Sequence, residues 1–169
     1  MTDVSVDSAS SRYRIYGAEL SPYSVKVRSY FRFKQIPHQW IIRSTDTMDD
    51  FAKFARLPII PLVVSPQLQG AQDSTLIIQH LESEHQKDSI YPQDTTVNFI
   101  STLLEEFGDE WGNKWMFHYR WARDIDQLAS ARRIAQLTQP DANAEQLDQL
   151  TEQVRLRMTG RVWFVGSNP

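Results

Sequence analysis

The sequence of 169 residues contains no cysteine, and this absence excludes more chemistry than any other feature of its composition. Disulfide exchange needs one thiolate that attacks and a second thiol that resolves the intermediate. Frameworks of disulfide bonds and zinc sites built from thiolates are excluded on the same ground. A chain without cysteine fits a reducing compartment, so we expect a cytoplasmic protein.

Long apolar runs, glycine-rich loops and a strong net charge are also missing. No stretch approaches the ~18–20 apolar residues that a membrane-spanning helix needs, so we expect no membrane partner. The six glycines are scattered, and none forms part of a loop that would cradle phosphate groups. The net charge of −3 disfavours a nucleic-acid partner, because that binding depends on neutralising phosphates. No histidine pair has the spacing of metal ligands, so we expect no metal.

What the sequence does contain indicates two regions. Hydrophobic residues make up 41% of the chain, which suffices for a buried core, and the length allows one domain or two small ones. Strand-like and helix-like patterns alternate up to residues 86–94, and helical spacing follows from Thr95 onward. We therefore divide the chain into a flexible polar leader at 1–11, an α/β domain at 12–88 and a helical domain at 94–169.

The α/β region shows a regular order of elements, namely strand, helix, strand, helix, strand, strand, helix. The expected strands lie at 12–16, 40–42, 61–64 and 68–72, and the expected helices run from 22 to a stop at Ile36-Pro37, from about 46 to 55, and from 74 onward. A right-handed crossover between parallel strands, followed by a hairpin, fits this order.

The helical region is expected to contain one long helical segment from Thr95 to about Ala122 and two further helices at about 125–138 and 142–158. The break between the last two falls at the Gln139-Pro140-Asp141 segment.

Aromatic side chains recur at helical spacing in the long segment, and they allow two interpretations. Trp111, Trp115 and His118 either line an apolar substrate pocket, together with Tyr23 from the α/β region, or form part of a buried helix core.

The segment Ser21-Pro22-Tyr23-Ser24 has the form of a Cys-Pro-Tyr-Cys redox motif in which hydroxyls replace both sulfurs. Ser21 is a good helix N-cap, because Pro22 can occupy the first helical position. A helix N-terminus also stabilises an anion, so the Ser21 hydroxyl is either a plain cap or a donor to the thiolate of a bound ligand. Ser24 and Tyr16 are the alternative donors.

The order of elements, the Ile60-Pro61 segment at the third strand and the Asp73-Ser74 pair at the following helix together resemble the N-terminal domain of glutathione transferases. The segments 108–111 and 118–121 are similar to a bacterial subgroup of such proteins. The resemblance implies a thioredoxin-like α/β fold (βαβαββα) followed by an all-α domain. Members of the family usually carry further helices, so we expect a fragment or a shortened helical domain.

The resemblance also implies site residues. Ser21 lies where the family places its catalytic serine or cysteine, and Ile60-Pro61 corresponds to a cis-proline segment whose backbone pairs with glutathione. Gln72, Asp73 and Ser74 would hold the charged γ-glutamyl end, with the helix start and the Ser74 hydroxyl on the carboxylate and Asp73 on the ammonium.

The function implied is that of a dimeric glutathione transferase of the detoxification type, which binds glutathione as co-substrate and activates its thiol for attack on a small apolar electrophile. Two alternatives remain open. One is a non-catalytic binding or assembly protein of the same fold, and the other is a glutathione-dependent isomerase or dehalogenase.

Overall fold

The computed structural model describes residues 12–167, so the expected leader at 1–11 lies outside the described residues. The chain divides into two compact units, residues 1–89 and 90–169. Within the described part, no helix is long and apolar enough to cross a bilayer.

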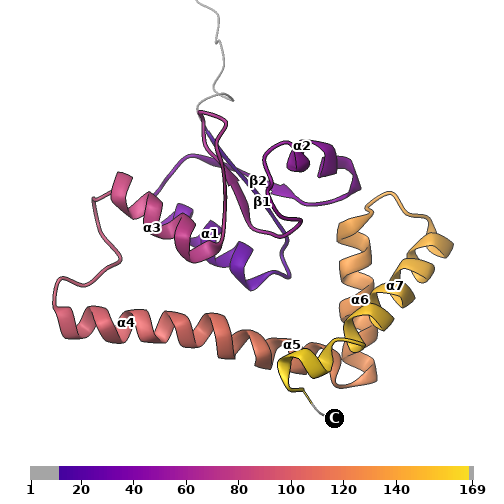
Figure 1. The fold of residues 1–169 in the computed structure, drawn as a ribbon. Helices are drawn as coiled ribbons and strands as arrows, with labels where there is room; N and C mark the ends of the chain where they lie inside the picture. Colours follow the sequence, from indigo (N-terminus) through magenta and orange to yellow (C-terminus); the bar gives the residue numbers. More distant parts are fainter. Residues whose placement is uncertain (1–11, 168–169) are drawn as a thin grey trace, which may run out of the picture. The chain divides into compact units, whose positions relative to one another are not determined.

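The N-terminal unit is built on one sheet of four strands in the order β2-β1-β3-β4 (Figure 1). The strands are β1 (Tyr13–Gly17), β2 (His38–Ile42), β3 (Leu62–Val64) and β4 (Gly70–Gln72). β1 is parallel to β2 and antiparallel to β3, and β3 is antiparallel to β4. The strands β1, β2 and β4 therefore all point in one direction, and β3 points in the other.

Helices cover both faces of this sheet, because successive strand side chains point to opposite faces. The helices α1 (Pro22–Phe33) and α3 (Ser74–Glu84) pack on the face of Ile15 and Val63. The short helix α2 (Met48–Ala52) follows a 3₁₀ turn at Thr45–Thr47 and places Phe51 against Tyr16 on the opposite face. This is the predicted thioredoxin-like arrangement.

Several element ends differ from the predicted bounds by one to three residues, and local backbone geometry explains two of the differences. The first helix ends at Phe33 rather than at Ile36-Pro37, because Gln35 adopts a φ of 55°, outside the helical region. The fourth strand begins at Gly70 rather than at residue 68, because Leu68 adopts a φ of 62° and its N–H donates to the Ser65 carbonyl within the turn.

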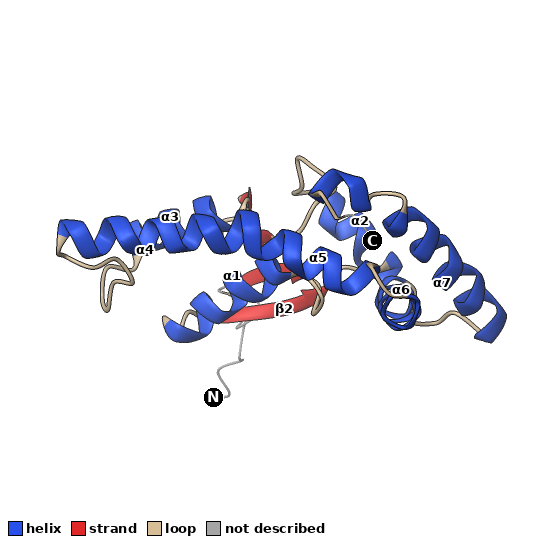
Figure 2. Cartoon of the chain, turned by 90° about the horizontal axis from the view of Figure 1, so that it is seen from below, coloured by secondary structure: helices blue, strands red, loops and turns tan. Residues whose placement is uncertain are grey.

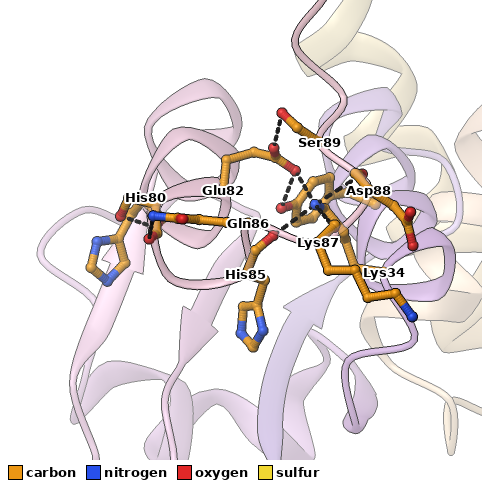
Figure 3. Close-up of polar contacts among 10 residues, drawn as sticks. Lys34, His80, Glu82, His85, Gln86, Lys87, Asp88 and Ser89 are labelled. Carbon is orange, nitrogen blue, oxygen red and sulfur yellow. Dashed lines mark hydrogen bonds and ion pairs between the residues drawn. The ribbon is translucent and has the colours of Figure 1, made fainter.

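The C-terminal ends of α1 and α3 are joined by a buried polar network (Figure 3). The Lys34 Nζ lies 2.7 Å from a Glu82 carboxylate oxygen and donates to the backbone carbonyls of His85 and Lys87, each at 2.8 Å, and of Asp88 at 3.1 Å. The side chains of Lys34 and Glu82 are only 3% and 5% exposed. One ammonium group thus fixes the chain segment that leaves α3.

The Glu82 carboxylate also accepts from the hydroxyls of Tyr30 and Ser89, each at 2.8 Å. Burial alone would raise its pKa, but the hydrogen bonds from Lys34, Tyr30 and Ser89 outweigh burial and hold the pKa below its ordinary value. A lowered folded-state pKa stabilises the fold above the unfolded pKa, which is near 4.5, and this stabilisation is lost as pH falls further.

We therefore expect the stability of the N-terminal unit to fall below about pH 4.5, and to fall less steeply in Glu82→Gln than in the wild type. Urea unfolding at a series of pH values measures the slope. Equal slopes for both proteins would show that Glu82 does not contribute to the pH dependence.

The described part of the C-terminal unit consists of helices alone (Figure 2). They are α4 (Thr95–Phe107), a π-helical turn (Gly108–Gly112), α5 (Asn113–Trp121), α6 (Asp124–Thr138), α7 (Ala144–Thr159) and a final 3₁₀ turn (Val162–Val165). A small core of Trp121, Ala131 and Val154 joins α5, α6 and α7. The predicted long helical segment is therefore two α-helices linked by a π turn.

Candidate functional site

One edge of the sheet collects the start of α1, the start of α3 and the loop that enters β3. The register pairs Tyr16 with Leu62 and Leu62 with Gln72, so these three residues form one row across β1, β3 and β4. β1 and β4 end just beyond this row, and β3 begins there because it runs in the opposite direction. Ser21 follows β1, Asp73-Ser74 follow β4, and the Ile60-Pro61 segment precedes β3, so all three segments adjoin this edge in the chain connectivity.

Ser21 is the N-cap of α1, as predicted. Its backbone is extended (φ −95°, ψ 112°), and its Oγ accepts from the Ser24 N–H at 3.2 Å. Capping uses a lone pair of the oxygen and leaves the O–H free to rotate and donate. A cap and a donor to a bound anion are therefore compatible in the same hydroxyl.

The two alternative hydroxyls are less suited to reach a ligand. Ser24 is 0% exposed, and a Cβ on Gly17 would lie 2.8 Å from the Ser24 Cβ, so its hydroxyl is enclosed behind the end of β1. The Tyr16 hydroxyl donates to Asp50, and burial together with this hydrogen bond raises the pKa of Tyr16 to about 12. Of the three, Ser21 alone is partly exposed.

The Ser24 Oγ is buried without a hydrogen-bond partner among the described residues. An unsatisfied buried hydroxyl destabilises, so its removal costs little. We expect Ser24→Ala to change the free energy of unfolding by less than about 1 kcal/mol, in either direction. Urea denaturation measures this change, and a loss above about 2 kcal/mol would show that the hydroxyl has a partner.

The Ile60–Pro61 peptide bond is cis, which confirms the predicted isomer. Ile60 is partly buried, and Pro61 separates it from the start of β3.

Asp73 and Ser74 begin α3 with an unusual backbone. Asp73 adopts φ 78° and ψ 116°, and its carboxylate accepts from the N–H groups of Thr75 at 3.0 Å and Leu76 at 3.2 Å. A non-glycine residue with positive φ is strained and is kept where the surrounding structure requires it, often at a ligand site. Ser74 occupies the first helical position and is buried.

A lysine that the sequence did not indicate lies beside this helix start. The Lys26 Nζ donates to the Thr75 Oγ1 at 3.3 Å, so α1 brings a positive charge to the N-terminus of α3. The two residues are 49 positions apart, and no local pattern marks their contact.

The predicted role of Gln72 as a direct contact to the ligand is not supported by its hydrogen bonds. Its side-chain oxygen accepts hydrogen bonds from two backbone N–H groups of residues 56–59, and its side-chain nitrogen donates to two backbone carbonyls of the same segment. A primary amide has two N–H donors and one carbonyl oxygen with two lone pairs, and all of these are engaged. Gln72 therefore holds a loop rather than offering free groups at the edge.

The residues predicted for an apolar pocket belong to different units. Tyr23 lies in α1, whereas Trp111, Trp115 and His118 lie in the π turn and α5. Trp111 and Trp115 are 54% and 52% exposed, so the alternative that they form a helix core is wrong for these two. The His118 Nδ1 lies 2.6 Å from the Ser167 Oγ. The pocket itself stays a prediction.

Comparison with known families agrees with the fold of the N-terminal unit. Residues 15–89 match the family model of the glutathione S-transferase N-terminal domain. No curated protein sequence matches the chain.

Solved structures share the fold at low sequence identity. A glutathione S-transferase from Methylobacterium radiotolerans, in complex with glutathione sulfonate, has a TM-score of 0.57 and 20% identity, over 88% of this chain and 62% of that one. A glutathione S-transferase from Methylobacillus flagellatus with bound glutathione has a TM-score of 0.53 and 18% identity, over 89% of this chain and 66% of that one. A glutathione S-transferase from Rhodospirillum rubrum has a TM-score of 0.59 and 16% identity, over 93% of this chain and 81% of that one.

The chain thus spans about three-fifths of the length of the Methylobacterium enzyme. Among the described residues, no group of three or more histidine and acidic side chains is placed to hold a metal ion. Residues 15–89 are thus similar to the N-terminal domain of glutathione S-transferases, and the chain has the thioredoxin-like fold of the solved glutathione S-transferases.

Proposed function

We propose that the protein binds glutathione at the edge defined by Ser21, Ile60-Pro61 and Asp73-Ser74, and that Ser21 stabilises the glutathione thiolate for attack on a small apolar electrophile. The observation that carries this proposal is the register of β1, β3 and β4, which aligns the end of β1 and the end of β4 with the start of β3. The bound glutathione in a related structure supports the choice of ligand.

The γ-glutamyl end, the cysteinyl backbone and the thiol of glutathione each have a matching group at this edge. The Ser74 hydroxyl and the start of α3 suit the γ-glutamyl carboxylate, and the Asp73 carboxylate suits the ammonium group. The backbone of Ile60 suits the amide groups around the cysteinyl residue, as a short added strand would. The start of α1 and the Ser21 O–H then suit the thiolate.

The reaction that follows is nucleophilic transfer. The thiol releases its proton to solvent, and the sulfur lone pair forms a bond to an electrophilic carbon of the second substrate. A leaving group departs with its electron pair, or the adduct takes up a proton. Ser21 donates a hydrogen bond to the thiolate and increases its population near neutral pH, without forming a covalent bond itself. We expect the protein to act as a cytoplasmic homodimer.

A second candidate is binding of glutathione without conversion of an electrophile. It is favoured by the exposure of Trp111 and Trp115, which within their own unit do not enclose a substrate. A glutathione-dependent isomerase or dehalogenase would use the same thiolate.

Calorimetric titration with glutathione tests the binding proposal. We expect millimolar or tighter affinity for the wild type and a loss of about tenfold or more in Ser74→Ala, because a hydrogen bond to a charged group contributes about 1.5–3 kcal/mol. Ser83→Ala is the matched control, since Ser83 lies in the last turn of the same helix and is exposed. No binding by the wild type, or equal binding by all three proteins, would contradict the proposal.

A further inference from the structure

We propose that Gln72 is a positioning residue, which ties the loop before β3 to the end of β4 and so keeps Ile60 and Asp73 at the spacing that glutathione requires. This inference rests on the proposed function and adds to it a residue that does not touch the ligand. It explains why every hydrogen-bond donor and acceptor of the Gln72 side-chain amide is bound to the backbone of residues 56–59.

Four hydrogen bonds define the contact. The Gln72 Oε1 accepts from the backbone N–H of Arg56 at 2.9 Å and of Leu57 at 3.0 Å. The Gln72 Nε2 donates to the carbonyls of Leu57 and Ile59, each at 2.8 Å. One side chain therefore satisfies two N–H groups and two carbonyls of an irregular segment, as a neighbouring strand would.

The loop is anchored at its two ends, where Ala55 and Ile60 pack against the core around Tyr16 and Leu62, but little holds the four residues between them. Residues 56–59 lie between α2 and β3 and form no regular element. Leu57 and Ile59 are 56% and 50% exposed, so burial of their side chains contributes little to fixing the segment. The hydrogen bonds to Gln72 therefore restrain the backbone of Arg56, Leu57 and Ile59, directly before Ile60.

Gln72 is also suited to this role by its place in the sheet. Its backbone pairs with Leu62 in β3, and the next residue is Asp73, with its positive φ. The side chain and the backbone of a single residue thus restrain both parts of the proposed site, the loop before Pro61 and the start of α3. Loss of the side-chain bonds would release the loop while the β3–β4 pairing remained.

A released loop lowers the fraction of molecules that can bind. Apparent affinity falls in proportion to the binding-competent fraction, so a loop ordered only a tenth of the time weakens binding tenfold. For Gln72→Met, which keeps the length of the side chain and removes its polar groups, we expect the dissociation constant for glutathione to rise about tenfold or more. Gln67→Met is the matched control, because Gln67 is exposed in the β3–β4 turn.

The variant Gln72→Glu separates positioning from general destabilisation. An ionised carboxylate would face the carbonyls of Leu57 and Ile59, which repel it, whereas a protonated carboxyl can donate to one of them. We therefore expect this variant to bind weakly at pH 8 and to recover affinity, relative to the wild type, as pH falls to 4, below the ordinary glutamate pKa of about 4.3. A purely structural defect would not recover in this way.

The experiment is a titration of wild type, Gln72→Met, Gln72→Glu and Gln67→Met with glutathione at pH 4 and pH 8, at a temperature well below each melting temperature. The expected result is weak binding by Gln72→Met at both pH values and pH-dependent recovery in Gln72→Glu alone. Wild-type affinity in Gln72→Met, or no recovery in Gln72→Glu, would overturn the role of Gln72 and leave the proposed function standing. No binding by the wild type would overturn both.

Discussion

Lys34→Met is expected to lower the free energy of unfolding of the N-terminal unit by about 3–5 kcal/mol, the cost typical of removing one partner of a buried ion pair. Lys34 is almost fully buried, and its ammonium group contacts Glu82 and three backbone carbonyls. The variant would leave Glu82 buried without the Lys34 charge, and it would remove one donor from each of the three carbonyls. Urea denaturation followed by circular dichroism measures the change.

Two further variants make this result specific. Lys53→Met removes a lysine of similar length whose side chain is 66% exposed, so we expect a change below about 1 kcal/mol. In Lys34→Met/Glu82→Gln, part of the loss should be recovered, because the buried negative charge is removed as well. Equal losses for Lys34→Met and Lys53→Met would show that the buried network contributes little.

Ser21→Ala is expected to lower kcat for thioether formation by about 100-fold, which is the effect of removing one preorganised donor to a developing anion. The KM for glutathione should change little, because the neutral thiol of the ground state depends less on this donor than the thiolate does. Steady-state kinetics with a generic chloronitroaromatic electrophile measure both constants.

Ser21→Ala also removes the N-cap of α1, so a control must separate the loss of stability from the loss of the donor to the thiolate. Removing a serine cap costs about 1 kcal/mol of stability. Ser21→Asp keeps a capping acceptor at the start of α1 but places a negative charge beside the thiolate, so it should be as stable as the wild type and nearly inactive. Ser21→Thr keeps the hydroxyl and should retain part of the activity. High activity in Ser21→Asp would show that the hydroxyl is not a donor to the thiolate.

The N-terminal architecture could be predicted because its signals are local. Ser21 with Pro22 marks the start of α1, and Asp73 with Ser74 marks the start of α3, and the structure begins both helices there. The strand order then follows from a crossover and a hairpin. The errors lie at element ends, where positive φ values at Gln35 and Leu68 depend on turn geometry that composition does not reveal.

The contacts that complete the site could not be predicted, because they join residues far apart in the sequence. Lys26 donates a hydrogen bond to Thr75, and Gln72 accepts one from the loop at 56–59. Both contacts depend on the sheet, which places these distant segments side by side. The position of Gln72 beside Asp73 predicts a contact with the ligand, whereas its side-chain amide binds the backbone of residues 56–59.

The helical region illustrates a different limit. Spacing correctly indicated helices from Thr95 onward, and the predicted break near Pro140 separates α6 from α7. Spacing alone does not tell a buried aromatic residue from an exposed one. Trp121 is buried in the core, whereas Trp111 and Trp115, with the same periodicity, remain half exposed.

The pKa of the glutathione thiol in its complex with the protein tests the central claim most directly, and the ultraviolet absorbance of the thiolate reports it as pH is raised. We expect the bound thiol to have a pKa below the value near 8.5 that is ordinary for a cysteine thiol. In Ser21→Ala, the pKa should return toward that value while glutathione stays bound. An unshifted pKa in the wild type, or the same lowered pKa in both proteins, would contradict the role assigned to Ser21.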